Sequence, residues 1–321
     1  MMAEQIIIPP GADKPNQDVF SETLQRLAEA DKNIIAVTSD SRGSGKLAPF
    51  GKKFPGQIVE VGIAEQNLVG VAAGLASCSK KVFAVSPACF LTARSLEQIK
   101  NDICYSNNPA TLVGISAGVS YGALGSTHHS LHDFAVLRAI NNIIIVAPAD
   151  NFETAKATEL AAASDVPVYL RFGKKVMPSL EADNSDGFVF GKGRVITEGD
   201  DVAIIANGET VYPAVKAAEK LKANGIAATV VSMHTIKPLD TELITSLAQK
   251  CKAIVTVEEH SVYGGLGEAV ASFLLQSGIA KQFKIIGIPD EYTVTGPQGD
   301  IFKHYGISEE GISDEVKRLL K

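Results

Sequence analysis

Short runs of β-branched and other apolar residues alternate with longer segments of helical period along most of the chain. Residues 34–38 and 111–115 are two such runs, and residues 65–77 form one of the longer segments between them. Neighbouring parallel strands need a crossover connection, usually a helix, so this alternation predicts an α/β fold with mostly parallel sheets flanked by helices. We expect strands at residues 34–38, 82–85, 111–115, 143–146 and 168–170, and helices that include residues 65–77 and 151–163.

A polar stretch interrupts this alternation near the middle of the chain. Residues 174–187 read KKVMPSLEADNSDG, and the proline and the acidic cluster in it are typical of a surface linker. A chain of 321 residues is long enough for two domains. We therefore predict one α/β domain at residues 1–180 and a second, smaller one at residues 190–321. In the second we expect strands at residues 202–206, 228–232, 253–257 and 284–288, and helices at residues 211–223, 241–249 and 267–276.

The composition excludes several classes of protein. With 45% hydrophobic residues, 21% charged residues and a formal net charge of −6, the chain is globular and offers no basic surface to nucleic acid. Its four cysteines are far apart, so neither a zinc site nor a disulfide framework is indicated, and we assign no metal ligand. No apolar stretch of eighteen residues and no leader pattern is present, so we expect a cytoplasmic protein without a membrane span.

A single carboxylate stands out where an expected strand passes into the helix at residues 65–77. Residues 59–75 read VEVGIAEQNLVGVAAGL, and Glu65 lies at the start of the helix. One interpretation is ordinary, because the helix dipole stabilises an acidic residue in the first turn. The other is functional, because the small residues that follow Glu65 allow close approach of a backbone or a flat ligand.

Six spaced motifs cover almost the whole chain. They are GIAEQN (62–67), FLTARSLEQIKND (90–102), GSTHHS (125–130), VAPADNFE (146–153), TIKPLD (235–240) and EEHSVYGGLGEAV (258–270). In the same order, they resemble motifs of transketolases, 1-deoxyxylulose-5-phosphate synthases and, more loosely, the beta subunits of 2-oxoacid dehydrogenases. The resemblance is strongest to split transketolases, and implies a subunit made of the thiamine-diphosphate-enzyme pyrimidine-binding domain and the C-terminal domain.

The resemblance implies that two residues bind thiamine diphosphate. Glu65 matches the glutamate that hydrogen-bonds the cofactor's aminopyrimidine ring and promotes formation of its imino tautomer, which removes the thiazolium proton. That role is general acid–base catalysis, to which a buried carboxylate is suited. Phe90 matches the aromatic residue that packs on the pyrimidine ring, although a phenylalanine is more often a plain core residue.

Further residues match the family's substrate site. His128, which forms a cluster with His129 and His132, matches the histidine that faces the substrate oxygens, where an imidazole can move a proton or donate a hydrogen bond. Ser44 and Arg171 match residues that hold a sugar phosphate, since arginine pairs well with phosphate oxygens. The alternatives for Arg171 are a surface arginine or an ion pair between the domains.

Three positions depart from the family's substrate site. Gln17 stands where an arginine of the phosphate site is expected, Ser116 where a histidine is expected, and Leu124 where the family has an aspartate that binds a donor hydroxyl. We therefore expect ketol transfer with an unusual donor or acceptor, such as a branched sugar. The sequence leaves open whether the substrates are phosphorylated.

The motif that holds the cofactor's diphosphate is missing from the sequence. Thiamine diphosphate enzymes bind the diphosphate through Mg²⁺, with a G-D-G motif and a downstream asparagine as oxygen ligands. No such motif is present. The resemblance therefore implies a partner, an N-terminal diphosphate-binding subunit that contributes most of the Mg²⁺ site, and an α2β2 assembly that is active only when both chains are present.

We expect this assembly to transfer a two-carbon ketol unit from a ketose or ketose phosphate to an aldose or aldose phosphate in carbohydrate metabolism. One alternative is a 1-deoxyxylulose-5-phosphate-synthase-like or 2-oxoacid-dehydrogenase-beta-like subunit, which decarboxylates an oxoacid before transfer. Another is a scaffold subunit without catalysis. Glu65 argues against a scaffold, because burying an unpaired carboxylate costs several kcal/mol.

Overall fold

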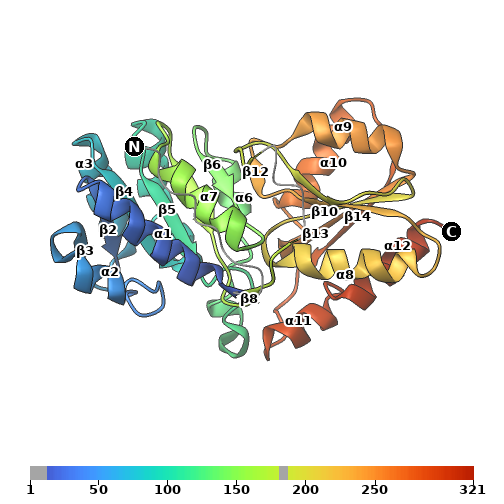
Figure 1. Ribbon diagram of the computed structural model, residues 1–321, viewed down its shortest axis with the longest axis horizontal. Coiled ribbons are helices and arrows are strands. Elements are labelled where there is room, and N and C mark those ends of the chain that lie inside the picture. Colours follow the sequence, from blue (N-terminus) through green and yellow to red (C-terminus); the bar gives the residue numbers. More distant parts are fainter. Residues whose placement is uncertain (1–12, 181–186) are drawn as a thin grey trace.

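The computed structural model describes residues 13–180 and 187–321, which form two lobes side by side (Figure 1). Each lobe contains a mostly parallel sheet flanked by helices, so the predicted α/β fold class with two domains is confirmed. The boundary between residues 180 and 190 stays a prediction, because residues 181–186 lie outside the described residues. Within the described ranges, none of the helices has the length and apolarity that a membrane crossing requires.

The first sheet orders its described strands as β12-β6-β7-β5-β4-β2-β3. β12 is antiparallel to β6, and the other neighbours are parallel. Every residue of β2 and β5 is buried, as expected for strands with helices on both faces. The strands are β2 (Ile34–Thr38), β3 (Ile58–Glu60), β4 (Lys81–Pro87), β5 (Thr111–Ile115), β6 (Ile144–Val146), β7 (Val168–Arg171) and β12 (Thr235–Lys237), and the short β1 (Lys14–Pro15) and β8 (Val176–Met177) pair separately.

Two hydrophobic clusters hold the helices against this sheet. On one face, Phe20 and Leu24 of α1 and Ala157 of α7 pack in a cluster with Phe83 and Val113 of the sheet. The other face is covered by α3, α6 and the π-helical segment η2. The helices are α1 (Asn16–Ala30), α2 (Ala48–Lys53), α3 (Glu65–Ser77), α4 (Ala88–Arg94), α5 (Leu96–Gln98), η2 (Ile99–Tyr105), α6 (Asp133–Arg138) and α7 (Asn151–Ala162), with 3-10 turns η1 (Pro55–Gln57) and η3 (Gly122–Thr127).

The second sheet orders its described strands as β14-β13-β10-β11-β9, with β9 antiparallel to β11 and the other pairs parallel. Helices α9 and α10 lie on one face, and α8, α11 and α12 lie on the other (Figure 1). The elements are β9 (Arg194–Thr197), β10 (Val202–Ala206), β11 (Ala228–Ser232), β13 (Ala253–Ser261), β14 (Gln282–Ile288), α8 (Val211–Lys222), α9 (Thr241–Lys250), α10 (Leu266–Gln276), α11 (Gln298–His304) and α12 (Glu309–Leu319), with the 3-10 turn η4 (Gly208–Thr210).

The two domains share a strand and a hydrophobic core. β12 comes from the second half of the chain, yet it pairs with β6 at the edge of the first sheet. One hydrophobic cluster continues from the first sheet through Met233 and Ile236 into the second, where it includes Ile205. Buried contacts, and not only the linker, therefore set the orientation of the two domains.

Candidate active site

The carboxyl ends of the parallel strands in the first sheet carry residues that the sequence singled out. Glu65 opens α3 after β3, Phe90 lies in α4 after β4, and His128 follows η3 after β5. Binding sites in open parallel sheets form at this edge, where loops and helix starts converge. Side-chain contacts link all three residues in the folded chain.

Glu65 is a buried carboxylate with a charged partner. Its side chain is 5% exposed at the first residue of α3. Nη1 of Arg94 donates to both of its oxygens, at 2.9 and 3.0 Å, while the side chain of Arg94 is 49% exposed. The sequence interpretation missed Arg94, although it lies four residues after Phe90 in α4. That spacing puts both residues on one helix face and is the signal that could have identified the arginine.

Phe90 lies between this arginine and a histidine. Cζ of Arg94 is 4.3 Å from the centroid of the Phe90 ring, a cation–π contact. The ring of His128 meets Phe90 edge-on, with the centroids 5.3 Å apart. His128 meets Tyr121 in the same way at 5.4 Å, and Nζ of Lys174 lies 4.8 Å from the Tyr121 ring centroid. We call this set of contacting residues the edge cluster: Glu65, Arg94, Phe90, His128, Tyr121 and Lys174.

The two histidines near His128 in sequence have other surroundings. The ring nitrogens of His129 contact the hydroxyl of Thr293 at 2.7 Å and the carbonyl oxygen of Gly122 at 3.0 Å. Burial lowers the pKa of His129, so it is a neutral, structural residue near pH 7. Nε2 of His132 contacts the hydroxyl of Thr92 on α4 at 3.3 Å. These contacts favour His128 over His129 and His132 as the histidine that faces the substrate. The catalytic role of His128 stays a prediction.

Ser44 lies at the same edge of the sheet, in the loop after β2. It is exposed, and its hydroxyl donates to the carbonyl oxygen of Ser41 at 3.3 Å. Gly45 brings this loop close to the strands, since a Cβ there would lie 3.0 Å from Cγ1 of Val85 and 3.6 Å from Cδ1 of Ile115. The loop therefore packs over the ends of β4 and β5, and a substrate contact of Ser44 stays a prediction.

The three positions that depart from the family pattern supply no charge. Nε2 of Gln17 donates to the hydroxyl of Ser116 at 3.4 Å, and both residues are buried. A neutral, hydrogen-bonded pair thus stands where the motif comparison expected an arginine and a histidine. Leu124 is 54% exposed on η3, so it presents an apolar surface.

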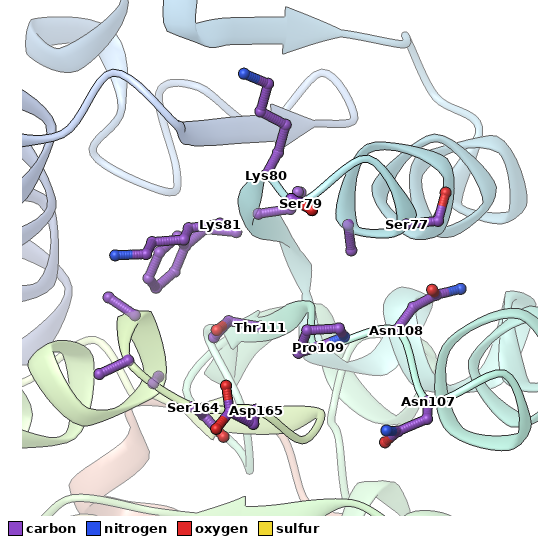
Figure 2. Close-up of a pocket in the computed structure, with 16 residues that line it drawn as sticks. Ser77, Ser79, Lys80, Lys81, Asn107, Asn108, Pro109, Thr111, Ser164 and Asp165 are labelled. Carbon is purple, nitrogen blue, oxygen red and sulfur yellow. The ribbon is translucent and has the colours of Figure 1, made fainter.

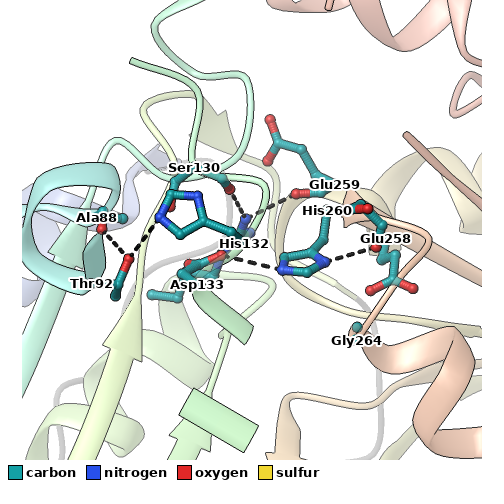
Figure 3. Close-up of polar contacts among 12 residues, drawn as sticks. Ala88, Thr92, Ser130, His132, Asp133, Glu258, Glu259, His260 and Gly264 are labelled. Atoms are coloured by element: carbon teal, nitrogen blue, oxygen red, sulfur yellow. Dashed lines mark hydrogen bonds and ion pairs between the residues drawn. The ribbon is translucent and has the colours of Figure 1, made fainter. Parts of the chain in front are cut away.

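Arg171 has contacts that do not support its predicted role in holding a phosphate. The side chain is buried, and its Nε donates to Oδ2 of Asp133 at 2.7 Å. Its Nη2 donates to the carbonyl oxygens of Ser130 at 3.2 Å and Glu259 at 2.9 Å. Glu259 belongs to β13 of the second domain. Figure 3 shows that Ser130 and Asp133 of the first domain lie close to Glu259. The ion pair of Arg171 with Asp133 therefore lies within the first domain, and its hydrogen bond to the carbonyl oxygen of Glu259 crosses to the second. A phosphate contact of Arg171 stays a prediction.

Asp133 is the charged centre of this interface. The hydroxyl of Tyr169 also donates to its Oδ2, at 2.8 Å. Burial by itself would raise the pKa of Asp133, but the charge of Arg171 and these hydrogen bonds hold the pKa below its ordinary value. Nε2 of His260 lies 3.7 Å from Oδ1 of Asp133, and burial lowers the pKa of His260 to about 4. Asp133 is therefore ionised opposite Arg171, and His260 is neutral near pH 7.

Two buried carboxylates of the second domain lie beside this ion pair. Glu259 accepts a hydrogen bond from the backbone nitrogen of Val119 at 2.9 Å, and Glu209 accepts one from that of Lys175 at 3.0 Å. Both carboxylates also accept from Nε2 of Gln298, at 2.6 and 2.7 Å. Burial, and then the charge of Glu209, raise the pKa of Glu259 to about 8. Glu259 therefore retains a proton near pH 7.

The retained proton predicts that the stability of the chain falls as the pH rises through the pKa of Glu259. The pKa of Glu259 in the folded chain lies above its ordinary value of 4.5, so between these values the folded chain binds more protons than the unfolded chain. The free energy of unfolding should then fall by roughly 1 kcal/mol between about pH 7 and pH 9, and Glu259→Gln should remove most of that loss. Urea unfolding at both pH values measures it, with exposed Glu198→Gln as the control. An equal loss in wild type and Glu259→Gln would contradict the assignment.

A groove elsewhere on the first domain is less suited than the edge cluster to binding a ligand. A groove of about 620 Å³ lies at the amino ends of β4 and β5 (Figure 2). Its lysines are already paired, Lys80 with Asn33 and Lys81 with Asp31, each at 2.9 Å. Among the described residues, no polar side chain of this groove is both buried and without a partner. In residues 13–180 and 187–321, no group of three His, Cys, Asp or Glu side chains is placed to hold a metal ion.

Comparisons with known proteins give matches along both domains. The model of the transketolase pyrimidine-binding domain matches residues 14–179, and that of the transketolase C-terminal domain matches residues 191–312. The chain is 48% identical over 302 residues to an apulose-4-phosphate transketolase subunit of Phocaeicola vulgatus, covering 94% of this chain and 96% of that protein. It is 37% identical over 304 residues to the 1-deoxy-D-xylulose-5-phosphate synthase of Halothermothrix orenii, covering 94% of this chain and 48% of that protein.

Among solved structures, the chain is similar to a split-gene transketolase described as an inactive beta4 tetramer. The TM-score is 0.87 at 35% sequence identity, and the match covers 96% of this chain and 98% of that one. This likeness extends over both domains, so the arrangement of the two lobes is shared as well as the fold of each.

Proposed function

This chain belongs to the transketolase family, and from that premise we propose that it is the second subunit of a two-chain transketolase that uses thiamine diphosphate. The observation that carries the proposal is the edge cluster. In it a buried carboxylate, an aromatic ring and an imidazole are linked by contacts at the carboxyl edge of a parallel sheet. That edge is where such folds bind cofactors.

The edge cluster fits the aminopyrimidine of thiamine diphosphate. Glu65 can offer both oxygens to a planar N–H donor, as it does to Arg94, and Phe90 can offer its ring to the same planar group. When bound, the cofactor supplies the carbanion chemistry of ketol transfer. In this proposal Glu65 holds a proton at a pyrimidine nitrogen, Phe90 orients the ring, and His128 exchanges a proton with a substrate oxygen.

We propose that a second polypeptide holds the diphosphate and Mg²⁺ in an α2β2 assembly. The relative at 48% identity is named as one subunit of a transketolase, and the structure at 35% identity is that of a split-gene transketolase. The surface around α3 supports a protein contact, because Ile63 and Tyr105 are 74% and 85% exposed. Gly70 and Gly74 of α3 have open space around them, so a partner could approach closely.

For the substrates, we propose a ketose or ketose phosphate as donor and an aldose or aldose phosphate as acceptor. Apulose 4-phosphate, which appears in the name of the relative at 48% identity, is the first compound to test. The neutral pair of Gln17 and Ser116 supplies no charge to a phosphate. Lys174 is exposed beside Tyr121 and offers a cation instead, with Ser44 as a further hydroxyl donor in our proposal.

The proposed function is tested by co-expressing this chain with a diphosphate-domain subunit and titrating the complex with thiamine diphosphate and Mg²⁺ by calorimetry. Each chain alone serves as the control. We expect binding by the complex only, and cleavage of apulose 4-phosphate or another ketose phosphate when an aldose acceptor is added. Tight binding by this chain alone, or no binding by the complex, would contradict the two-chain proposal.

A second candidate is a subunit that decarboxylates an oxoacid before transfer. The observation in its favour is the 37% identity to a 1-deoxy-D-xylulose-5-phosphate synthase. The same complex distinguishes the two, since release of carbon dioxide from pyruvate would favour the decarboxylating reaction over ketol transfer. A scaffold without catalysis would show neither reaction. Burial of Glu65 does not exclude a scaffold, because Arg94 already pairs with its charge.

A further inference from the structure

Arg94 makes the two contacts that the proposed function assigns to the cofactor. Its Nη1 donates to both oxygens of Glu65, and its Cζ lies 4.3 Å from the centroid of the Phe90 ring. A guanidinium and an aminopyrimidine share the relevant chemistry, since both are planar, present N–H groups to a carboxylate and stack on an aromatic face. We propose that Arg94 is an internal competitor for the pyrimidine site and must leave Glu65 and Phe90 before the cofactor binds. This inference rests on the proposed function.

The two partners of the ion pair differ in their freedom to move. Glu65 is 5% exposed at the start of α3, whereas Arg94 is 49% exposed at the last residue of α4. A long side chain that is half in solvent can change rotamer without disturbing the core, and water screens its charge. The carboxylate therefore stays in place, and the guanidinium is the group that a ligand can displace.

The pairing of Arg94 with Glu65 stabilises the folded chain but lowers its affinity for the cofactor. Without Arg94, the carboxylate of Glu65 would be buried with no charged partner, which destabilises a folded protein. With Arg94 in place, the site is open only in the fraction of molecules in which the guanidinium has moved away. The apparent dissociation constant of the cofactor rises as this fraction falls, so a site that is open one-tenth of the time binds about tenfold more weakly.

The test measures the affinity of the co-expressed two-chain complex for thiamine diphosphate, with Mg²⁺ present, by calorimetry. We expect Arg94→Ala to lower the dissociation constant by roughly three- to tenfold. Lys100→Ala is the matched control, because Lys100 is exposed on the following η2 segment and its loss removes the same charge. Lys100→Ala should leave the dissociation constant unchanged. Arg94→Lys keeps the charge without the planar fork and should also bind the cofactor more tightly than wild type.

A second comparison tests whether the effect of Arg94→Ala on cofactor affinity depends on Glu65. In a Glu65→Gln background the guanidinium loses its charged anchor, so Arg94→Ala should change the dissociation constant less than it does in the wild-type background. Equal or weaker cofactor binding by Arg94→Ala in the wild-type background would overturn this inference alone. Absence of binding by every complex, Arg94→Ala included, would overturn the proposed function and this inference with it.

Discussion

Glu65→Gln is expected to lower the turnover of the reconstituted two-chain enzyme by about 10² to 10⁴-fold, the usual range for loss of a general acid–base group. The amide keeps the size of the side chain and can still form hydrogen bonds, but it cannot exchange a proton with a ring nitrogen. Since Arg94 is half exposed, loss of the charge on Glu65 should cost little folding stability. The expected defect is therefore in catalysis and not in folding.

Steady-state kinetics measure the turnover of the variant, and calorimetry measures its binding of thiamine diphosphate. The kcat of Glu65→Gln should fall while the complex still forms and still binds thiamine diphosphate. Glu97→Gln is the matched control, because Glu97 is an exposed glutamate on the adjacent α5 and the same charge is removed. Wild-type turnover by Glu65→Gln would show that the carboxylate does not move the proton, and would leave its burial as a structural feature only.

Asp133→Asn is expected to lower the free energy of unfolding by about 3–5 kcal/mol, since removing one partner of a buried ion pair leaves an uncompensated charge. Asp133 is fully buried and accepts hydrogen bonds from Nε of Arg171 and from the hydroxyl of Tyr169. The asparagine keeps one acceptor oxygen but supplies no negative charge to Arg171. Because Arg171 also binds the carbonyl oxygen of Glu259, the loss should loosen the contact between the two domains.

Urea unfolding of the full chain measures this effect. Glu242→Gln is the control, because it breaks the pair with Lys192 in which Glu242 is 84% exposed, and such surface pairs contribute about 1 kcal/mol or less. The double variant Asp133→Leu with Arg171→Met removes both buried charges and should recover a large part of the loss. A loss for Asp133→Asn no greater than that of the control would contradict a structural ion pair and favour the phosphate-binding prediction for Arg171.

Most of the regular elements could be predicted from the sequence. The strands predicted at residues 34–38, 111–115, 202–206 and 228–232 have those bounds in the structure, and α3 begins at Glu65 and ends at Ser77 as predicted. These segments are long and strongly patterned, because central strands of a parallel sheet are buried on both faces. The short edge strands β3, β9 and β12 were not predicted, since each includes polar or charged residues that interrupt the apolar run.

The candidate site was predicted only in part. The motifs singled out Glu65, Phe90 and His128, and the fold brings these together because each follows a strand whose carboxyl end lies at one edge of the sheet. The motifs did not distinguish between two roles for Arg171, a phosphate contact or an ion pair. Its partners are Asp133, 38 residues earlier, and Glu259, 88 residues later, and no local pattern relates these positions.

Local sequence patterns are enough to specify the alternation of strands and crossovers, the class of the two domains and the position of Glu65 at a helix start. These features follow from the spacing of apolar and small residues, which depends on neighbours a few positions away. The pairing of Arg94 with Glu65, and of Arg171 with the second domain, is visible only in the folded chain. Arg94 ends a helix and Arg171 ends a strand, and the burial and charge pairing of each depend on which distant segments the fold brings together.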